Sequence, residues 1–156
     1  MIFSGDCDNH NTMRKYTYLK IAPADVGGVW TKVAPLITKA MATSRGEANA
    51  EHFRRSLVKG QMDLFVAANE GEVVVAMVTQ FIQHANYTAL RVCVLAGSEP
   101  KVLSACVDEY WPELIEWSKT QGATKWEAYC HVGMARLLQK HGFGERYAVV
   151  VKDLEN

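Results

Sequence analysis

The stretch that decides the fold of this chain is Trp126-Glu-Ala-Tyr-Cys-His-Val-Gly-Met-Ala-Arg-Leu-Leu-Gln-Lys-His-Gly-Phe143. Its first residues alternate as a short strand does, and those after His131 repeat apolar side chains every three to four positions, as in a helix. Gly142 can adopt the left-handed backbone that ends helices, so that Phe143 packs back onto the helix. Because a strand that enters a helix without a loop parts from its neighbour, we expect a wedge between the two backbones.

The residues before this stretch predict one strand, two helices, three antiparallel strands and a long helix, in that order. The strands are expected at 16–21, 62–68, 73–82 and 87–95, and the helices at 26–41, 47–59 and 100–121. The turn Asn69–Glu72 is a strong hairpin signal. Pro35 predicts a kink or a division into two short helices, and Pro112 predicts a bend between the two halves of the long helix. Asp25 is expected to cap the first helix, and Ser98 or Glu99 the long one.

The composition fits one soluble domain and disfavours two classes of partner. With 156 residues, 49% of them hydrophobic, the chain can bury a full core over residues 14–156. Seventeen basic and seventeen acidic residues give a net charge of zero, which leaves no excess to attract nucleic acid. No apolar run reaches the roughly 18–20 residues of a membrane span. We therefore expect no nucleic acid partner, no membrane association and a cytoplasmic location.

The first twelve residues are polar and lack the features of a secretion signal, so residues 1–13 are expected to form a flexible arm. Four cysteines without a CxxC pair are interpreted as free thiols, mostly buried, in a reducing cytosol: Cys7, Cys93, Cys106 and Cys130. Cys7 and His10 resemble half of a zinc site without its second pair, so no metal is expected. Cys130 and His131 form either a nucleophilic pair or a core thiol beside a structural imidazole. Strand neighbours point to opposite faces, which favours the structural interpretation.

The opening stretch resembles the last conserved segment of the GNAT N-acyltransferases, which runs Asn-x-x-Ala-x-x-Leu-Tyr-x-Lys-x-Gly-Phe after a strand. Four positions match, namely Leu137, Lys140, Gly142 and Phe143. His131 replaces the family's Asn, Met134 its Ala, and Leu138 the Tyr that often protonates the leaving thiolate. The predicted element order also matches over almost the whole chain. The resemblance implies an α+β, GNAT-like fold, with a mixed, mostly antiparallel sheet flanked by helices on both faces.

The same resemblance implies acetyl-CoA as co-substrate and an unidentified amine, on a small molecule or a protein, as acceptor. It places the coenzyme in the wedge between Leu95 and Tyr129, along the central strand and the loop after it. The implied contacts are Val92, Cys93, Val94, Leu95, Gly97, Ser98, Lys101 and His131. The family's glycine pattern is absent from this loop, Pro100 removes an amide and Glu99 adds a negative charge. A capped helix start without a ligand is therefore an equal alternative.

Amine acetylation requires a base for the acceptor and a proton donor for the leaving thiolate. Glu127 is the first candidate base, with His131 or Glu72 behind it. The alternative is that Glu127 faces water on a half-exposed strand. Since Leu138 cannot donate a proton, the candidate acids are Tyr129 and Tyr147.

The departures from the family pattern keep a second function open, a catalytically inactive GNAT-fold protein that acts by binding, in a structural or accessory role. Such divergent members are loosely similar to proteins encoded by tailed bacteriophages. A regulatory partner that sequesters another protein fits the same features. Glu145–Val151 fills only one closing strand, so a sheet edge is left open, and a homodimer in which a second subunit completes it would be natural.

Overall fold

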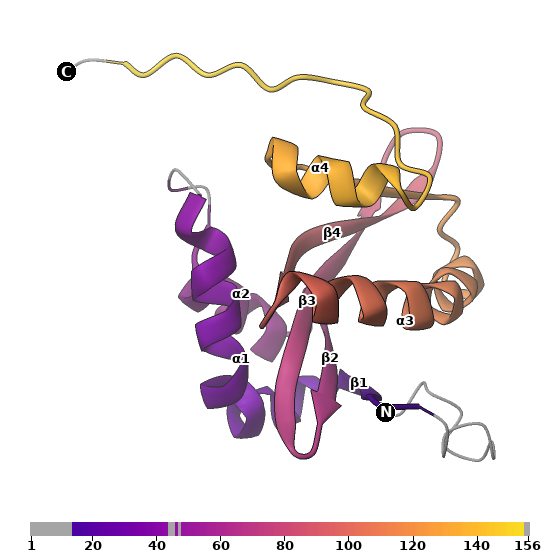
Figure 1. The fold of residues 1–156 in the computed structure, drawn as a ribbon. Coiled ribbons are helices and arrows are strands. Elements are labelled where there is room, and N and C mark those ends of the chain that lie inside the picture. Colours follow the sequence, from indigo (N-terminus) through magenta and orange to yellow (C-terminus); the bar gives the residue numbers. More distant parts are fainter. Residues whose placement is uncertain (1–13, 44–45, 47, 155–156) are drawn as a thin grey trace.

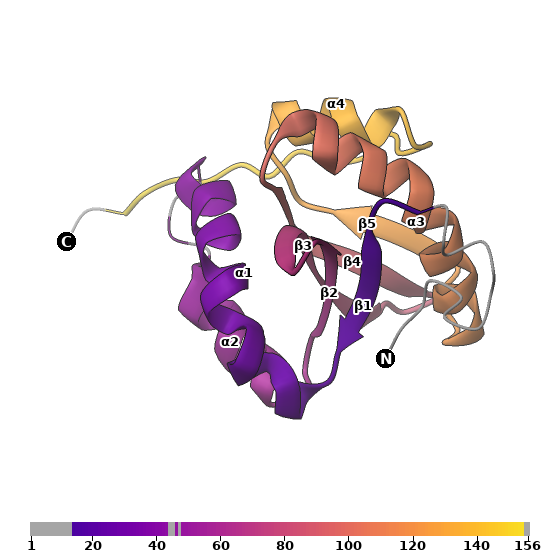
Figure 2. The same ribbon diagram turned by 60° about the horizontal axis from the view of Figure 1, so that its bottom comes forward.

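The computed structural model describes residues 14–43, 46 and 48–154, which form a five-stranded sheet between two layers of helices (Figure 1, Figure 2). The strands are β1 (Thr17–Ile21), β2 (Asp63–Asn69), β3 (Glu72–Gln83), β4 (Thr88–Gly97) and β5 (Lys125–Ala128). The helices are α1 (Val26–Ala40), α2 (Ala50–Val58), α3 (Pro100–Thr120) and α4 (Val132–Gln139), with 3-10 turns at Pro23–Asp25 and Met41–Thr43. The arm expected at residues 1–13 lies outside the described residues.

The sheet order is β1-β2-β3-β4-β5, with three antiparallel pairings followed by a parallel one between β4 and β5. Helices α1 and α2 cover one face, and α3 and α4 the other (Figure 2). Strand β2 shows why both faces are covered, because Leu64 and Val66 join the α1/α2 core while Phe65 and Ala67 join the α3/α4 core. The expected α+β architecture is confirmed.

The hairpin between β2 and β3 forms where the sequence predicts it. Glu70 and Gly71 both have positive φ, 51° and 82°, as required of the two central residues of a tight hairpin turn. The register places Asn69 opposite Glu72. A local signal was sufficient here because the turn needs nothing from the rest of the fold.

Each internal proline lies within one helix, so the division into two short helices, one of the two outcomes expected at Pro35, does not occur. Pro35 is inside α1, and Pro112 is inside α3. In α3 the buried Trp111 and Leu114 flank the proline, so packing onto the sheet continues on both sides and offsets the lost hydrogen bond. Among the helices described, none is long and apolar enough to cross a bilayer.

The caps expected from Asp25 and from Ser98 or Glu99 are also wrong. Asp25 holds the N-cap position of α1 but already has a helical backbone, since a 3-10 turn precedes it, and its side chain makes no capping bond. Glu99 holds the N-cap of α3 without a side-chain bond. Its side chain is longer than those that normally fold back onto first-turn amides.

The closing strand expected at Glu145–Val151 is absent from this part of the chain. After Phe143 the backbone runs away from the sheet as an extended tail (Figure 1). The tail carries large apolar side chains that are 76% to 90% exposed, namely Tyr147, Val149, Val150, Val151 and Leu154. High β-propensity does not form a strand unless another strand supplies its hydrogen bonds.

Candidate functional site

Strands β4 and β5 separate after a short paired section. The parallel pairs run from Ala89 with Lys125 to Val92 with Ala128. Strand β4 continues to Gly97, whereas β5 ends at Ala128, so β4 has no β5 partner beyond Val92. The expected wedge between Leu95 and Tyr129 is confirmed.

A β-bulge lies at the apex of this wedge. Val78 of β3 opposes Val94, but the next residue, Thr79, opposes Val92, which leaves Cys93 as the extra residue of β4. A bulge bends its strand and increases the local twist, which turns β4 away from β5. Burial raises the pKa of the Cys93 thiol to about 11, so this thiol is not a nucleophile near neutral pH.

The backbone of β4, rather than its side chains, is available to a ligand in the wedge. Val92, Val94 and Leu95 are all buried in the two cores. These three sequence-predicted contacts can therefore act only through main-chain amides and carbonyls, whereas the side chain of Cys93 is half-buried. Sequence cannot test such contacts, because any residue type supplies them.

A cavity of about 340 Å³ lies at the wide end of the wedge. Its walls come from three elements: Lys39 near the end of α1, the β4–α3 turn with Gly97 and Ser98, and the start of α4 with His131. Both α3 and α4 begin at this cavity. The positive ends of two helix dipoles and the Lys39 ammonium favour an anionic ligand here, whereas Glu99, which also lines the cavity, opposes one.

Gly97 makes the close turn from β4 into α3 feasible. A Cβ at this position would lie 2.8 Å from the Cβ of Leu103. Because Glu99 makes no capping bond, its side chain leaves the first-turn amides of α3 to other acceptors. Lys101 is exposed and does not line the cavity, so of the predicted loop residues only Gly97 and Ser98 do.

His131 is the N-cap of α4, which supports the structural interpretation of this imidazole. Its Nδ1 accepts a hydrogen bond from the backbone N–H of Gly133 at 3.1 Å. Cys130 is exposed, so its predicted place in the core is wrong. The reason is that β5 ends at Ala128, and strand alternation no longer determines which way Cys130 points.

A polar cluster connects the paired section of β4 and β5. Glu127 Oε1 lies 2.6 Å from His84 Nε2, and Glu127 Oε2 accepts from Arg91 Nε at 2.8 Å and pairs with its terminal nitrogen at 2.6 Å. The same guanidinium donates to Tyr129 Oη at 3.2 Å and lies 4.4 Å from the centre of the Tyr129 ring. Glu127 is only 19% exposed, so it does not simply face water.

Glu127 is held as a carboxylate by its two partners. Partial burial on its own would raise the pKa of Glu127, but the hydrogen bonds from His84 and Arg91 outweigh burial and bring the pKa below its ordinary value. A carboxylate with both oxygens paired and a lowered pKa is a weak proton acceptor. The cluster is therefore better suited to orienting His84 than to direct base chemistry by Glu127.

Sequence reasoning missed His84 and the role of Arg91. His84 follows β3 in the turn to β4 and reaches β5 only through the folded sheet, 43 residues from Glu127 in sequence. The cross-strand partner Arg91 is 36 residues from Glu127. The only available signal was that Arg91 interrupts an otherwise apolar strand.

The other candidates occupy separate places. Glu72 begins β3 at the hairpin and belongs neither to the cluster nor to the cavity wall. Tyr129 lies beside Arg91 and is 66% exposed, whereas Tyr147 is 88% exposed in the tail. Leu138, which stands at the family's tyrosine position, is 3% exposed within the α3/α4 core.

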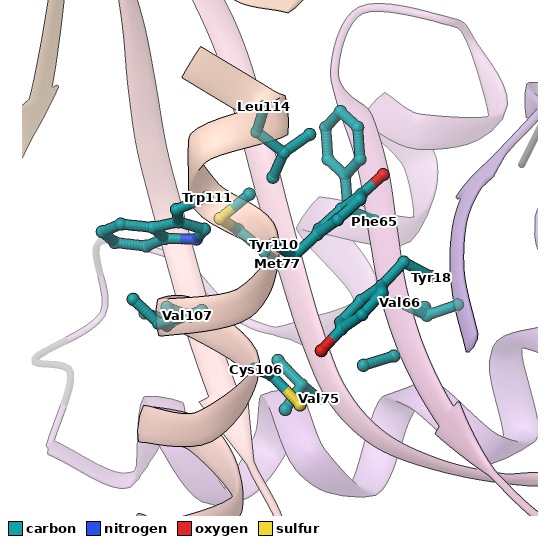
Figure 3. A pocket seen from close by; sticks show the side chains of 12 residues that line it. Tyr18, Phe65, Val66, Val75, Met77, Cys106, Val107, Tyr110, Trp111 and Leu114 are labelled. Carbon is teal, nitrogen blue, oxygen red and sulfur yellow. The ribbon is translucent and has the colours of Figure 1, made fainter. Parts of the chain in front are cut away.

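A second gap, of about 20 Å³, lies beneath α3 (Figure 3). The stacked rings of Tyr18 and Tyr110, with centroids 4.3 Å apart, form part of its wall. Burial raises the pKa of both phenols, so they stay neutral. This gap is too small for anything beyond a single water and is a packing feature of the core.

Over residues 14–43, 46 and 48–154, no group of three His, Cys, Asp or Glu side chains is arranged to hold a metal. The pair of Cys7 and His10 lies outside that range.

Comparison with known proteins identifies the fold. No family model matches the chain, and no curated protein matches its sequence. Among solved structures, a tetramutant of the BH1408 protein from Bacillus halodurans matches with a TM-score of 0.68 and 13% identity, over 88% of this chain and 99% of that one. An aminoglycoside acetyltransferase, meta-AAC0020 from an uncultured soil sample, bound to sisomicin, matches with a TM-score of 0.65 and 11% identity, over 94% and 100% of the two chains.

A predicted acetyltransferase from Clostridium acetobutylicum, solved with acetyl-CoA, also matches with a TM-score of 0.65 and 11% identity, over 88% of this chain and 96% of that chain. Identities this low show the fold and nothing finer. The chain has the GNAT fold, an α+β sheet with helices on both faces, as the resemblance in its C-terminal stretch implied.

Proposed function

We propose that this protein is an acetyl-CoA-dependent N-acyltransferase that acts on an amine. The observation that carries the proposal is the wedge between β4 and β5, which has a bulge at Cys93 and opens onto a cavity where α3 and α4 begin. A thioester attached to a long polyanionic carrier fits this arrangement, because the wedge offers backbone groups and the cavity favours anions. The structural neighbour solved with acetyl-CoA supports the same choice of co-substrate.

The residues present fit coenzyme A. Lys39, Ser98 and the first-turn amides of α3 would hold its phosphates, and the β4 backbone from Cys93 to Leu95 would hold its linear arm. When bound, acetyl-CoA supplies an activated acyl group. The protein must then deprotonate the acceptor amine, position it, and return a proton to the leaving group.

In this proposal His84 takes the proton from the amine, and Glu127 positions the imidazole of His84. With Nε2–H donated to Glu127, the imidazole keeps Nδ1 as a free acceptor, and the carboxylate stabilises the charge that forms on the ring. Glu127 as the direct base is the simpler sequence-based hypothesis, but both of its oxygens are already paired. Tyr129 is the proposed proton donor, since its hydroxyl accepts from Arg91 and keeps its own proton to give.

Coenzyme binding is tested by titration calorimetry with acetyl-CoA and with desulfo-CoA. Micromolar affinity is expected for both. Ser104→Glu places a negative charge on the cavity wall and should weaken binding at least tenfold. The control Ala105→Glu adds the same charge at the next, exposed position of α3 and should leave the affinity within a factor of two. The absence of a binding heat up to millimolar acetyl-CoA would refute coenzyme binding.

Turnover is tested by thiol release over a panel of amines that includes aminoglycosides, because some structural neighbours are aminoglycoside acetyltransferases. His84→Asn and Glu127→Gln should each lower kcat by tenfold or more while the coenzyme affinity stays nearly constant. Glu127→Gln should also change the pH profile of kcat, because it alters the partner of His84. Unchanged turnover in His84→Asn would remove this residue from the mechanism.

One observation favours the non-catalytic alternative, namely that a buried Leu138 occupies the family's tyrosine position. A binding or accessory protein of this fold could bind coenzyme A or lack affinity for it. In either case it would release no thiol with any amine. Thiol release that depends on His84 contradicts this alternative.

A further inference from the structure

We propose that two copies of this chain form a dimer by exchanging their tails. Residues 145–151 of each copy would add to the sheet as a strand along the outer edge of β5 in the other copy. This inference concerns assembly and does not rest on the proposed enzymatic function.

The acceptor half of this interaction is the outer edge of β5. Strand β5 pairs through its inner edge with β4 and has no partner on its outer edge within the described chain. The unpaired N–H and C=O groups of such an edge are a template for another strand. Tyr129 and Val132, both 66% exposed, lie just beyond the end of β5 and add apolar surface there.

The donor half is the tail. Of the nine large hydrophobic residues that are exposed in the described chain, five belong to the tail: Tyr147, Val149, Val150, Val151 and Leu154. Monomeric proteins rarely leave so many apolar side chains together in water. The segment is extended and rich in β-branched residues, so it is suited to pairing but has no strand to pair with.

The alternation of the two segments is compatible. In β5, Trp126 and Ala128 pack on the α3/α4 core, and Glu127 lies on the opposite face. In an extended tail, Tyr147 and Val149 share one face with Val151. A strand added beside β5 with this face toward α3 and α4 would extend the existing core by three apolar side chains.

The course of the tail favours a second copy as the partner. Phe143 remains attached to the core, 6.2 Å from the Trp111 ring. Beyond it the chain runs past α4 and away from its own β5 (Figure 1, Figure 2). A segment that projects from the body can reach the β5 of a neighbour, and the reciprocal contact closes a symmetric pair.

The first test is the mass in solution, measured by light scattering during gel filtration. The wild type is expected at twice the 17.4 kDa of one chain. Val149→Pro removes a backbone donor within the exchanged segment and should give a monomer with an unchanged circular dichroism spectrum. The control Asp153→Pro lies outside the segment and should remain dimeric. A monomeric wild type would overturn the proposal, as would a dimer unaffected by Val149→Pro.

Cross-linking between different chains separates exchange from a tail that folds back on its own β5. In a Cys7→Ser, Cys130→Ser background, one tagged chain carries Val149→Cys and an untagged chain carries Lys125→Cys. After mixing, a short bifunctional thiol reagent should join the tagged chain to the untagged one. A third chain carries both Val149→Cys and Lys125→Cys. If this chain cross-links within itself while the tagged and untagged chains do not join, the tail folds back on its own β5 and the exchange is refuted.

Discussion

At the scale of the residue, the properties of the candidate site depend on Glu127, whose two carboxylate oxygens have different hydrogen-bond partners. One accepts from His84 and the other from Arg91, which in turn contacts Tyr129. The carboxylate therefore connects the turn after β3 with the start of the wedge. Removing its charge would release a partly buried guanidinium as well as the imidazole.

The lowered pKa of Glu127 makes the stability of the fold depend on pH. Because the folded protein binds this proton more weakly than the unfolded chain does, the cluster contributes stability above the ordinary pKa of 4.5 and loses it as the pH falls through the lower folded value. Glu127→Gln should lower the free energy of unfolding by about 1–3 kcal/mol at pH 7, and the difference from wild type should shrink below pH 4.5.

Urea denaturation at several pH values measures this difference. The control is Glu116→Gln, since Glu116 is 72% exposed and pairs with Lys119 on the surface of α3. Its effect should stay within about 0.5 kcal/mol throughout. A pH-independent effect of Glu127→Gln would show that the carboxylate is not held in the charged form by the cluster.

Two glycines should respond in opposite ways to the same substitution. Gly97→Ala puts a methyl group 2.8 Å from Leu103 Cβ and should destabilise the fold by about 1–3 kcal/mol. Gly28→Ala, in α1 with nothing within 4 Å of the added Cβ, should stabilise it by about 0.5–1 kcal/mol. Thermal denaturation of both variants checks this pair, and equal shifts would contradict the close approach at Gly97.

Sequence identified part of this site because two of its residues lie close together in the segment that enters α4. Glu127 and Tyr129 could be found as polar positions in the segment before α4, the first within β5 and the second just after it. His84 could not, because its role depends on the register that brings the turn after β3 near β5. Lys39 was missed for the same reason, since α1 meets the cavity only in the folded protein.

At the scale of the element, α3 is held by the side chains that it buries against the sheet. Leu114 is 1% exposed and lines the small gap beneath the helix, while its neighbour Ile115 is 37% exposed. Leu114→Ala should enlarge the gap and lower the free energy of unfolding by about 2–5 kcal/mol. Ile115→Ala should cost about 1 kcal/mol or less. Comparable losses in the two variants, measured by urea denaturation, would contradict this packing.

The elements that sequence predicted well are the helices, because the spacing of their apolar side chains is enough to show which face packs on the sheet. Helix α4 ends as expected, with Gly142 at a φ of +90° and the N–H of Phe143 bonded to the carbonyl of Leu138. The tail was predicted as a strand on the same kind of evidence, but a strand also needs a neighbour in register. Periodicity describes a segment, whereas pairing depends on what lies beside it.

At the scale of the whole molecule, the reactivity of the cysteine thiols measures how well the fold excludes solvent from its core. Burial raises the pKa of Cys93 and Cys106 to about 11, while Cys130 is exposed with a pKa raised less markedly. In a Cys7→Ser background at pH 8, Ellman's reagent should modify the exposed Cys130 quickly, the half-buried Cys93 more slowly, and the buried Cys106 only at the rate of unfolding. Cys130→Ser should abolish the fast phase. A fast phase of two or three thiols would contradict the burial of β4 and α3.

The parallel contact of β4 with β5 has a kinetic consequence. Strands β2, β3 and β4 are joined by short hairpins, whereas β5 meets β4 only after the chain has passed through all of α3. Closing that longer loop is entropically slower, so the hairpins should assemble first and β5 should dock late. Competence to hold a ligand would then be acquired in the final stage of folding, and a nascent or partly melted chain would be inert even with most of its sheet intact.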